Sequence, residues 1–152
     1  MHLSEEQIAY AQQRKVREKL DKVEYRLQDY RNVNEKYDRI VSVGMFEHVG
    51  TAHYQEFFNK VYDLLNDSGV ALIHTIGRLN EPGNTDPWID KYIFPGGYIP
   101  ALSETVSRVE KSGLSLTDVQ ILKFHYAETL KRWRYNFYDN IDKVKEIYDE
   151  KF

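Results

Sequence analysis

Two polar side chains stand at the ends of apolar, β-branched runs in this 152-residue chain. Glu47 follows the run 38–44, and His74 lies near the end of the run 70–76. If these runs are neighbouring parallel strands, their carboxyl ends lie about 5 Å apart, at the edge of a sheet where small ligands bind. A carboxylate and an imidazole that converge there are suited to acid–base chemistry on one ligand. The alternative is that Glu47 faces water and His74 hydrogen-bonds to the backbone.

A strand–helix–strand unit would position these side chains. Residues 38–44 and 70–76 are short and rich in β-branched residues, which is typical of buried parallel strands. Between them, apolar residues recur at helical spacing, namely Tyr54, Phe57, Phe58, Val61, Leu64 and Leu65. Residues 67–69 (Asp-Ser-Gly) predict the end of this helix. The order of elements predicts a right-handed crossover and a parallel sheet, and so an α/β fold.

Local patterns predict the remaining elements. Ser4 and Gln7 have the spacing of a helix capping box, which predicts a helix from there to about Leu20. Alternation of apolar and charged residues predicts a strand over 22–27. Further along, the patterns predict a helix over 103–111, a strand over 114–122, a helix marked by Tyr126, Leu130, Trp133 and Phe137, and a helix marked by Ile141, Val144 and Tyr148.

A long loop, residues 77–100, follows the second buried run. Loops of this length usually carry function rather than only connecting two elements. Segment 88–97 concentrates aromatic residues beside Gly96 and Gly97, and this composition suits a lid over an apolar substrate. The alternative is that its aromatic side chains pack on the core. Packing alone also explains Tyr126 at the start of its helix.

Charge and composition limit the classes of function. The net charge is −3 and the basic residues are scattered, so we expect no nucleic-acid partner. The chain has no cysteine, which excludes disulfides and thiolate chemistry. No apolar run reaches the roughly 18–20 residues that span a bilayer, and the polar N-terminus is not typical of a signal peptide. We therefore expect a cytoplasmic protein.

A metal site is the competing interpretation of the same polar side chains. Glu47, His48, His74 and His125 are of the types that bind zinc or iron. Their spacing matches no known metal signature, and the consecutive residues Glu47 and His48 are poorly placed to reach one ion. We therefore expect no metal.

Five runs occur in an order that covers nearly the whole chain: residues 3–7 (LSEEQ), 27–31 (LQDYR), 38–50 (DRIVSVGMFEHVG), 91–97 (KYIFPGG) and 125–130 (HYAETL). In sequence and order they resemble the cyclopropane-fatty-acyl-phospholipid synthase family and its relatives that act on mycolic acids. The resemblance implies methylene transfer from S-adenosylmethionine to the cis double bond of a phospholipid acyl chain, which forms a cyclopropane ring. A carbocation must survive in a dry pocket, and bound bicarbonate removes a proton so that the ring closes.

The resemblance also assigns site residues. The positions that hold bicarbonate match Glu47, His74 and Tyr126, and Tyr148 matches a second tyrosine that reaches this site in the mycolic-acid relatives. Positions that bind or border the cofactor match Gln7, Gln28, Asp29, Tyr30, Val43 and Gly44. The residues 28–30 belong to the loop on the adenine side, and the backbone of residues 43–44 would line the bicarbonate pocket.

The fold that the resemblance implies is the Rossmann-like α/β fold of class I S-adenosylmethionine-dependent methyltransferases. In that fold this chain would supply strands 3, 4, 5 and 6 with flanking helices, as a single, incomplete domain over residues 1–152. The family's glycine-rich cofactor turn and active-site cysteine would lie upstream of Met1. We therefore expect an inactive fragment whose unpaired strand edges favour homo-oligomers.

The implied partners are phospholipid acyl chains, which a cytoplasmic enzyme would reach peripherally at the inner face of the membrane. Two alternatives remain open. One is a related methyltransferase that acts on another acceptor, such as a small amine or a different lipid. The other is a non-catalytic remnant that persists by association.

Overall fold

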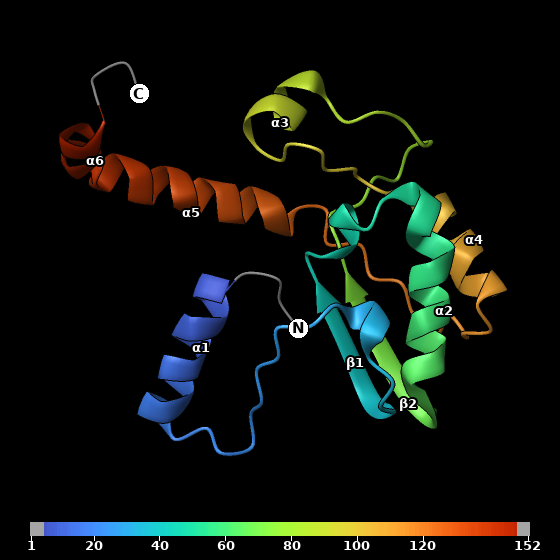
Figure 1. The fold of residues 1–152 in the computed structure, drawn as a ribbon. Coiled ribbons are helices and arrows are strands. Elements are labelled where there is room, and N and C mark those ends of the chain that lie inside the picture. The colour runs from blue at the N-terminus through green and yellow to red at the C-terminus, as the bar shows by residue number, and fades with distance from the viewer. Residues whose placement is uncertain (1–4, 149–152) are drawn as a thin grey trace. The chain divides into compact units, whose positions relative to one another are not determined.

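The computed structural model describes residues 5–148, and these form two compact units, residues 5–116 and residues 117–148. Figure 1 shows the elements of both units. The first contains α1 (Glu5–Glu18), β1 (Tyr37–Val43), α2 (Tyr54–Leu64), β2 (Leu65–His74), α3 (Pro87–Tyr92) and α4 (Leu102–Lys111). The second contains α5 (His125–Asp139) and α6 (Ile141–Ile147).

The two strands confirm the central strand–helix–strand prediction. β1 and β2 pair in parallel, with Arg39 opposite Val70 and, at the far end, Val43 opposite His74. Because a parallel pair needs a crossover, α2 lies between the strands in sequence and covers one face of the pair. The carboxyl ends of both strands consequently lie at one edge of the sheet.

Aromatic side chains dominate the core between α2 and the sheet. Phe46, Tyr54, Phe57 and Phe58 are each at most 2% exposed. The Phe46 ring stacks on Tyr54 with centroids 4.2 Å apart, and it lies 5.1 Å from Phe57 and 5.3 Å from Phe58. Val109 brings α4 into the same cluster, and α2 and α4 lie on the same side of the strand pair (Figure 1). Burial of this apolar surface is the main force that holds the unit together.

The opposite face of the strand pair is exposed. Alternate residues point away from α2, and Val41, Val43, Val70 and Leu72 are 54 to 65% exposed. Both faces of a parallel sheet are normally covered. This group of four side chains, the open sheet face, is therefore an apolar surface of a kind that promotes association.

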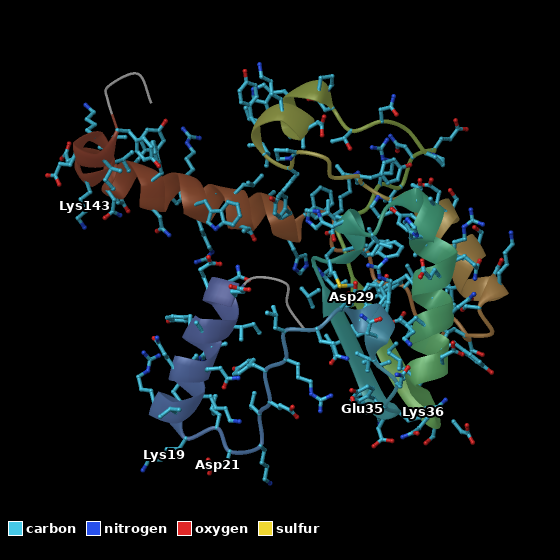
Figure 2. The ribbon with its side chains drawn as sticks, viewed as in Figure 1. Lys19, Asp21, Asp29, Glu35, Lys36 and Lys143 are labelled. Carbon is cyan, nitrogen blue, oxygen red and sulfur yellow. The ribbon has the colours of Figure 1, made fainter. Side chains whose placement is uncertain are left out.

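The helix α2 ends earlier than predicted. Its last residue is Leu64, and Leu65 is already extended, with φ −82° and ψ 141°. Residues 67–69, expected to end the helix, instead belong to β2, so this prediction is wrong. The cause is local: Leu65 is buried opposite Tyr37, and the Lys36 ammonium (labelled in Figure 2) donates a hydrogen bond to the Leu65 carbonyl over 3.1 Å.

Two predicted strands do not form. Residues 22–27 are irregular apart from a single bridge position at Leu27, and no strand lies within residues 114–122. The Arg26 guanidinium holds the first segment by ion pairs of 2.8 Å to Glu24 and 2.6 Å to Glu35. Alternation of apolar and polar residues describes two faces, but a strand also requires a neighbour to accept and donate its backbone hydrogen bonds. Neither segment has such a neighbour among the described strands.

The predicted helices at residues 103–111, 126–137 and 141–148 are confirmed as α4, α5 and α6. The first helix is confirmed as α1, while its predicted cap, Ser4, lies outside the described residues. The long loop contains an additional helix, α3, which begins because Asp86 accepts hydrogen bonds from the backbone N–H groups of Trp88 and Ile89. None of the helices between residues 5 and 148 combines the length and apolar character that crossing a membrane requires.

Candidate functional site

A tight turn at the carboxyl end of β1 presents Glu47. Gly44 has φ +62°, a left-handed conformation that favours glycine, and its N–H donates to the His74 carbonyl over 3.1 Å. The chain then forms a short 3-10 turn, Phe46–His48, which the buried Phe46 ring attaches to the core. Gly44 therefore allows the chain to turn sharply at the end of β1 while its own N–H still pairs with β2.

The Glu47 carboxylate is only half satisfied. Its Oε1 accepts a hydrogen bond of 2.7 Å from the Ile76 backbone N–H, just beyond the end of β2. Its Oε2 is buried, and no group among residues 5–148 donates to it. Buried carboxylate oxygens without a donor are costly and rare. A small ligand with a hydrogen-bond donor would satisfy this oxygen.

Beside Glu47 lies a cavity of about 160 Å³. Its lining residues are Gly44, Glu47, His48, Ile76, Thr85, Ile89, Phe94, Gly97, Tyr98 and Ile99. Most of the wall is apolar, so a charged group inside experiences weaker screening than it would in water. A Cβ atom placed at Gly44 would have no atom within 4 Å, which leaves the backbone there open to close approach by a ligand.

The long loop supplies more than half of the cavity wall. Hydrogen bonds hold it in shape: the Thr85 hydroxyl donates to the Gly97 carbonyl over 2.9 Å, and the Gly96 N–H donates to Asp90 over 2.9 Å. The Tyr98 N–H donates to the Glu47 carbonyl over 3.3 Å and so connects the loop to the turn after β1. A lid of this loop over an apolar substrate remains a prediction, and its side chains at the cavity are consistent with it.

The aromatic residues of α3 do not pack on the core. Trp88 and Tyr92 are 59% and 60% exposed, and their rings lie 5.7 Å apart. Ile89 and Phe94, in contrast, line the cavity. The loop therefore turns one set of apolar side chains to the cavity and another to solvent.

The structure brings together some of the predicted site residues. Gly44 and Glu47 line one cavity. Val43 and His74 lie opposite each other in register, both exposed and both outside the cavity lining. Their side chains point to the open sheet face, because in this register they alternate with residues that face α2. His74 contributes its backbone carbonyl to the turn, and the predicted role of its imidazole in ligand binding remains a prediction.

The residues assigned to the adenine side form a compact loop. The Gln28 amide donates to the Asn32 carbonyl over 3.2 Å. Asp29 (labelled in Figure 2) accepts from the Arg31 N–H over 2.9 Å and from its guanidinium over 2.6 Å. Those hydrogen bonds lower the pKa of Asp29 from 3.8 to about 2, so it is a carboxylate at neutral pH. Tyr30 packs edge-on against Phe57 at 5.7 Å, and burial raises its pKa.

Gln7 is exposed on α1. The assignment of Gln7 and of the loop 28–30 to cofactor binding remains a prediction. The contacts of Asp29 with Arg31 and of Tyr30 with Phe57 hold the loop in place.

Two of the predicted catalytic tyrosines belong to the second unit. Tyr126 is in the first turn of α5, 43% exposed, with its ring edge-on to Trp133 at 6.4 Å. Tyr148 follows α6, and its N–H donates to the Val144 carbonyl over 2.9 Å. That Tyr126 and Tyr148 share a bicarbonate site with Glu47 and His74 remains a prediction.

Some cavity residues were not predicted as part of this site: Thr85 and Tyr98 were not singled out in the sequence, and His48 was considered only as a metal ligand. The two glycines before Tyr98 were the available signal, because they allow the chain to turn sharply beside a ligand site. A further buried group is the Tyr54 hydroxyl, which has no partner among the described residues. Burial, followed by the nearby charge of Glu104, raises the pKa of Tyr54, so it keeps its proton. Within residues 5–148, no three histidine, aspartate or glutamate side chains gather as metal ligands.

Comparison with known proteins gives a consistent result. All 152 residues match the model of the family described as mycolic acid cyclopropane synthetase. The chain is 40% identical over 150 residues to the cyclopropane-fatty-acyl-phospholipid synthase of Escherichia coli K12, an alignment that covers 99% of this chain and 38% of the relative. It is 35% identical over 157 residues to a probable fatty acid methyltransferase of Pseudomonas putida, covering 98% and 40% of the two chains. The chain thus spans about two fifths of the length of these relatives.

Solved structures share the fold. The cyclopropane synthase MmaA2 from Mycobacterium tuberculosis superposes with a TM-score of 0.77 at 30% identity, covering 98% of this chain and 57% of that one. The mycolic acid cyclopropane synthase CmaA1, solved with SAH and CTAB, gives the same score and coverage at 31% identity. Coclaurine N-methyltransferase, at 24% identity and a TM-score of 0.78 over 99% of this chain and 46% of that one, shares the fold alone. These matches confirm the resemblance and the partial Rossmann-like methyltransferase fold: the chain belongs to the mycolic acid cyclopropane synthetase family.

Proposed function

We propose that this chain is part of an S-adenosylmethionine-dependent transferase that adds a methylene group to the cis double bond of a phospholipid acyl chain and forms a cyclopropane ring. The observation that carries the proposal is the Glu47 carboxylate beside an apolar cavity, whose Oε2 is buried and has no donor among residues 5–148. The name and the 40% identity of the Escherichia coli relative support the choice of a phospholipid. The enzyme would reach its substrate peripherally, at the inner face of the membrane.

Bicarbonate fits the environment of Glu47. The ion has one hydroxyl, and Glu47 Oε2 is a buried acceptor that lacks a donor among residues 5–148. A water molecule occupies about 30 Å³ in the liquid, so a cavity of about 160 Å³ has room for an ion of four heavy atoms. When bound, bicarbonate would supply a weak base for the proton that ring closure releases. The resemblance also assigns His74, Tyr126 and Tyr148 to bicarbonate binding, although the His74 imidazole lies on the open sheet face and outside the cavity lining in the structure.

The chain's own residues would protect the reacting carbon. The side chains of Ile76, Ile89 and Phe94 line the cavity and carry no nucleophile. They would exclude water from a cationic centre on the lipid, which water would otherwise trap. The left-handed turn at Gly44 leaves the backbone open on the cavity side.

S-Adenosylmethionine would supply the methyl group. We assign its binding to Gln7, Gln28, Asp29, Tyr30, Val43 and Gly44. Asp29 suits the adenine side because its carboxylate, ionised at physiological pH like any ordinary aspartate, can accept a hydrogen bond from the exocyclic amine. The comparison with CmaA1, solved with SAH, supports a cofactor of this class.

A second candidate is the addition of a methyl branch to the acyl chain instead of a ring. It is favoured by two relatives, the probable fatty acid methyltransferase of Pseudomonas putida and, at 34% identity over 163 residues, the tuberculostearic acid methyltransferase UfaA1 of Mycobacterium tuberculosis. Both candidates share the donor and the acyl substrate. Proton NMR of the lipid product separates them, because ring protons and a methyl branch have different chemical shifts.

The test is transfer of labelled methyl from S-adenosylmethionine to vesicles of cis-unsaturated phospholipid. It is run on the 152-residue chain and on the longest polypeptide that its gene encodes. Glu47→Gln should lower ring formation at least about 100-fold, since it removes an anionic acceptor at the reacting centre. Glu81→Gln, an exposed change outside the cavity lining, should leave the rate unchanged. Ring formation that survives Glu47→Gln would contradict the proposal.

We expect the 152-residue chain alone to bind S-adenosylmethionine weakly or not at all. Its described sheet has two strands, and the crevice that binds the cofactor in this class of fold is built by a larger sheet. Titration calorimetry measures this directly. Tight binding by a monomer would show that the residues present are sufficient for the cofactor site.

A further inference from the structure

Tyr98 is a polar side chain in the cavity wall to which the proposed function gives no role. Its backbone N–H donates to the Glu47 carbonyl over 3.3 Å, and its side chain lines the same cavity as Glu47. Its hydroxyl reaches away to Glu104, with distances of 3.1 and 3.0 Å to the two carboxylate oxygens. One residue thus connects the turn that carries Glu47 to a carboxylate on another element.

Glu104 belongs to a well-anchored part of the unit. It is the third residue of α4, and its Oε2 accepts from the Ala101 N–H over 2.9 Å, so it caps the helix. The helix itself is fixed to α2, because Val109 joins the core and the Gln55 amide donates to the Arg108 carbonyl over 3.3 Å. The Tyr98 hydroxyl therefore binds to a group that has little freedom to move.

Arg78 holds Tyr98 from another direction. Its guanidinium carbon lies 5.9 Å from the centre of the Tyr98 ring, within range of a cation–π contact. Its Nε donates to the Ile99 carbonyl over 3.1 Å, and its backbone N–H donates to the Pro100 carbonyl over 2.9 Å. The ring and the chain that follows it are both held by the same arginine.

Two backbone hydrogen bonds close the turn that carries Glu47: the His48 N–H donates to the Met45 carbonyl over 3.0 Å, and the Val49 N–H donates to the Phe46 carbonyl over 3.2 Å. This is a three-residue 3-10 turn, and Met45 before it makes no side-chain capping bond. Phe46 fixes one side of the turn by burial. From the loop side, the Tyr98 N–H bonds to the carbonyl of Glu47 itself. The bond from Tyr98 is thus the contact by which the long loop adds to these supports.

We propose that Tyr98 is a positioning residue for Glu47, and that the bond between its hydroxyl and Glu104 fixes the turn so that the Glu47 carboxylate stays on the Ile76 N–H. The consequence for catalysis rests on the proposed function, but the positioning itself does not. An alternative is that Tyr98 only adds packing to the loop. In that case, loss of its hydroxyl would affect the loop and leave Glu47 in place.

Hydrogen exchange followed by NMR separates these two roles in the 152-residue chain without cofactor or lipid. Tyr98→Phe keeps the ring and removes the bond to a charged acceptor. We expect exchange at the Ile76 amide to accelerate roughly tenfold, the loss typical of one such bond. Amides paired between β1 and β2 should change less than about twofold, and the exposed control Tyr92→Phe should change neither set.

Glu104→Gln provides the second, independent variant. The glutamine keeps one carbonyl oxygen as an acceptor, so we expect a smaller acceleration at Ile76 than with Tyr98→Phe. In the double variant the effects should be less than additive, because both changes remove the same bond. Unchanged exchange at Ile76 in both single variants would overturn the inference, as would equal acceleration throughout the unit.

The outcomes also separate this inference from the proposed function. If Glu47→Gln retains ring formation while Tyr98→Phe accelerates exchange at Ile76, the function is wrong and the positioning stands. If Glu47→Gln abolishes ring formation and Tyr98→Phe leaves exchange at Ile76 unchanged, the function stands and the positioning is wrong. In an active protein, Tyr98→Phe should lower kcat and leave KM for the lipid unchanged, because the lipid contacts stay in place.

Discussion

Removal of the Phe46 side chain should cost the first unit a large part of its stability. The ring is 0% exposed and contacts three other aromatic rings, with centroids 4.2, 5.1 and 5.3 Å away. Replacement of a buried phenylalanine by alanine costs about 3–5 kcal/mol through lost burial and the cavity that remains. A domain of this size is stable by about 5–15 kcal/mol in total. We expect Phe46→Ala to be near the high end of the range, because stacked aromatic pairs add to simple burial.

Urea unfolding followed by circular dichroism measures this cost. With a slope near 2 kcal/mol per molar urea, the midpoint should fall by about 2 M. Phe124→Ala makes the same chemical change at a side chain that is 76% exposed, and its midpoint should shift by less than about 0.3 M. Phe46→Leu, which keeps much of the volume, should fall between the two. Equal midpoints for Phe46→Ala and Phe124→Ala would refute the assignment of the aromatic cluster as the core.

Three further predictions concern other parts of the first unit. Arg31 lowers the pKa of Asp29 from 3.8 to about 2, so the carboxylate adds stability above pH 4 that is lost as the pH falls towards 2. The difference in unfolding free energy between the unmodified chain and Asp29→Asn, measured by urea unfolding, should therefore shrink over that pH range. A constant difference would count against the ion pair. Gly113→Ala should destabilise by roughly 1–2 kcal/mol, because φ is +85° and a Cβ would lie 3.1 Å from a tyrosine ring, whereas Gly77→Ala should be near neutral in the same assay. Leu72→Lys on the open sheet face should reduce self-association in sedimentation velocity without lowering the unfolding midpoint, and an unchanged sedimentation profile would exclude that face as the contact.

The sequence correctly predicted the elements in which the pattern of apolar residues matches the face that packs in the structure. The β-branched runs at 38–44 and 70–76 form the two strands, and the side chains on their face towards α2 are partly buried against the core. The helical spacing of Tyr54, Phe57, Phe58 and Val61 likewise identified the face that packs. In these segments the local pattern and the tertiary contacts agree.

Other elements depend on partners that the pattern does not encode. Residues 22–27 and 114–122 alternate as strands do, but no described strand bonds to them. The prediction that α2 ends at residues 67–69 was wrong because Leu65 is buried, and its burial sets where the helix stops and the strand β2 begins. Local propensity gives way to tertiary packing in such cases.

The candidate site shows the same division. Glu47 was identified because it follows a strand at the binding edge of a parallel sheet, and the structure places it in a cavity. The neighbouring wall depends on how a 24-residue loop, 77–100, folds back, and no periodicity describes that path. The link from Tyr98 to Glu104 spans an irregular segment, so only the folded chain reveals it.

The continuity of β1, α2 and β2 in sequence has a consequence for biosynthesis. Nearly all of the aromatic core, from Phe46 to Phe58, lies between two strands that pair with each other. As the ribosome releases residues 37–74, the growing chain already contains both strands and the helix that covers them. This segment can collapse during translation, before the long loop and α4 have left the exit tunnel. The open sheet face would then be exposed to other nascent chains and chaperones from the earliest stage of folding.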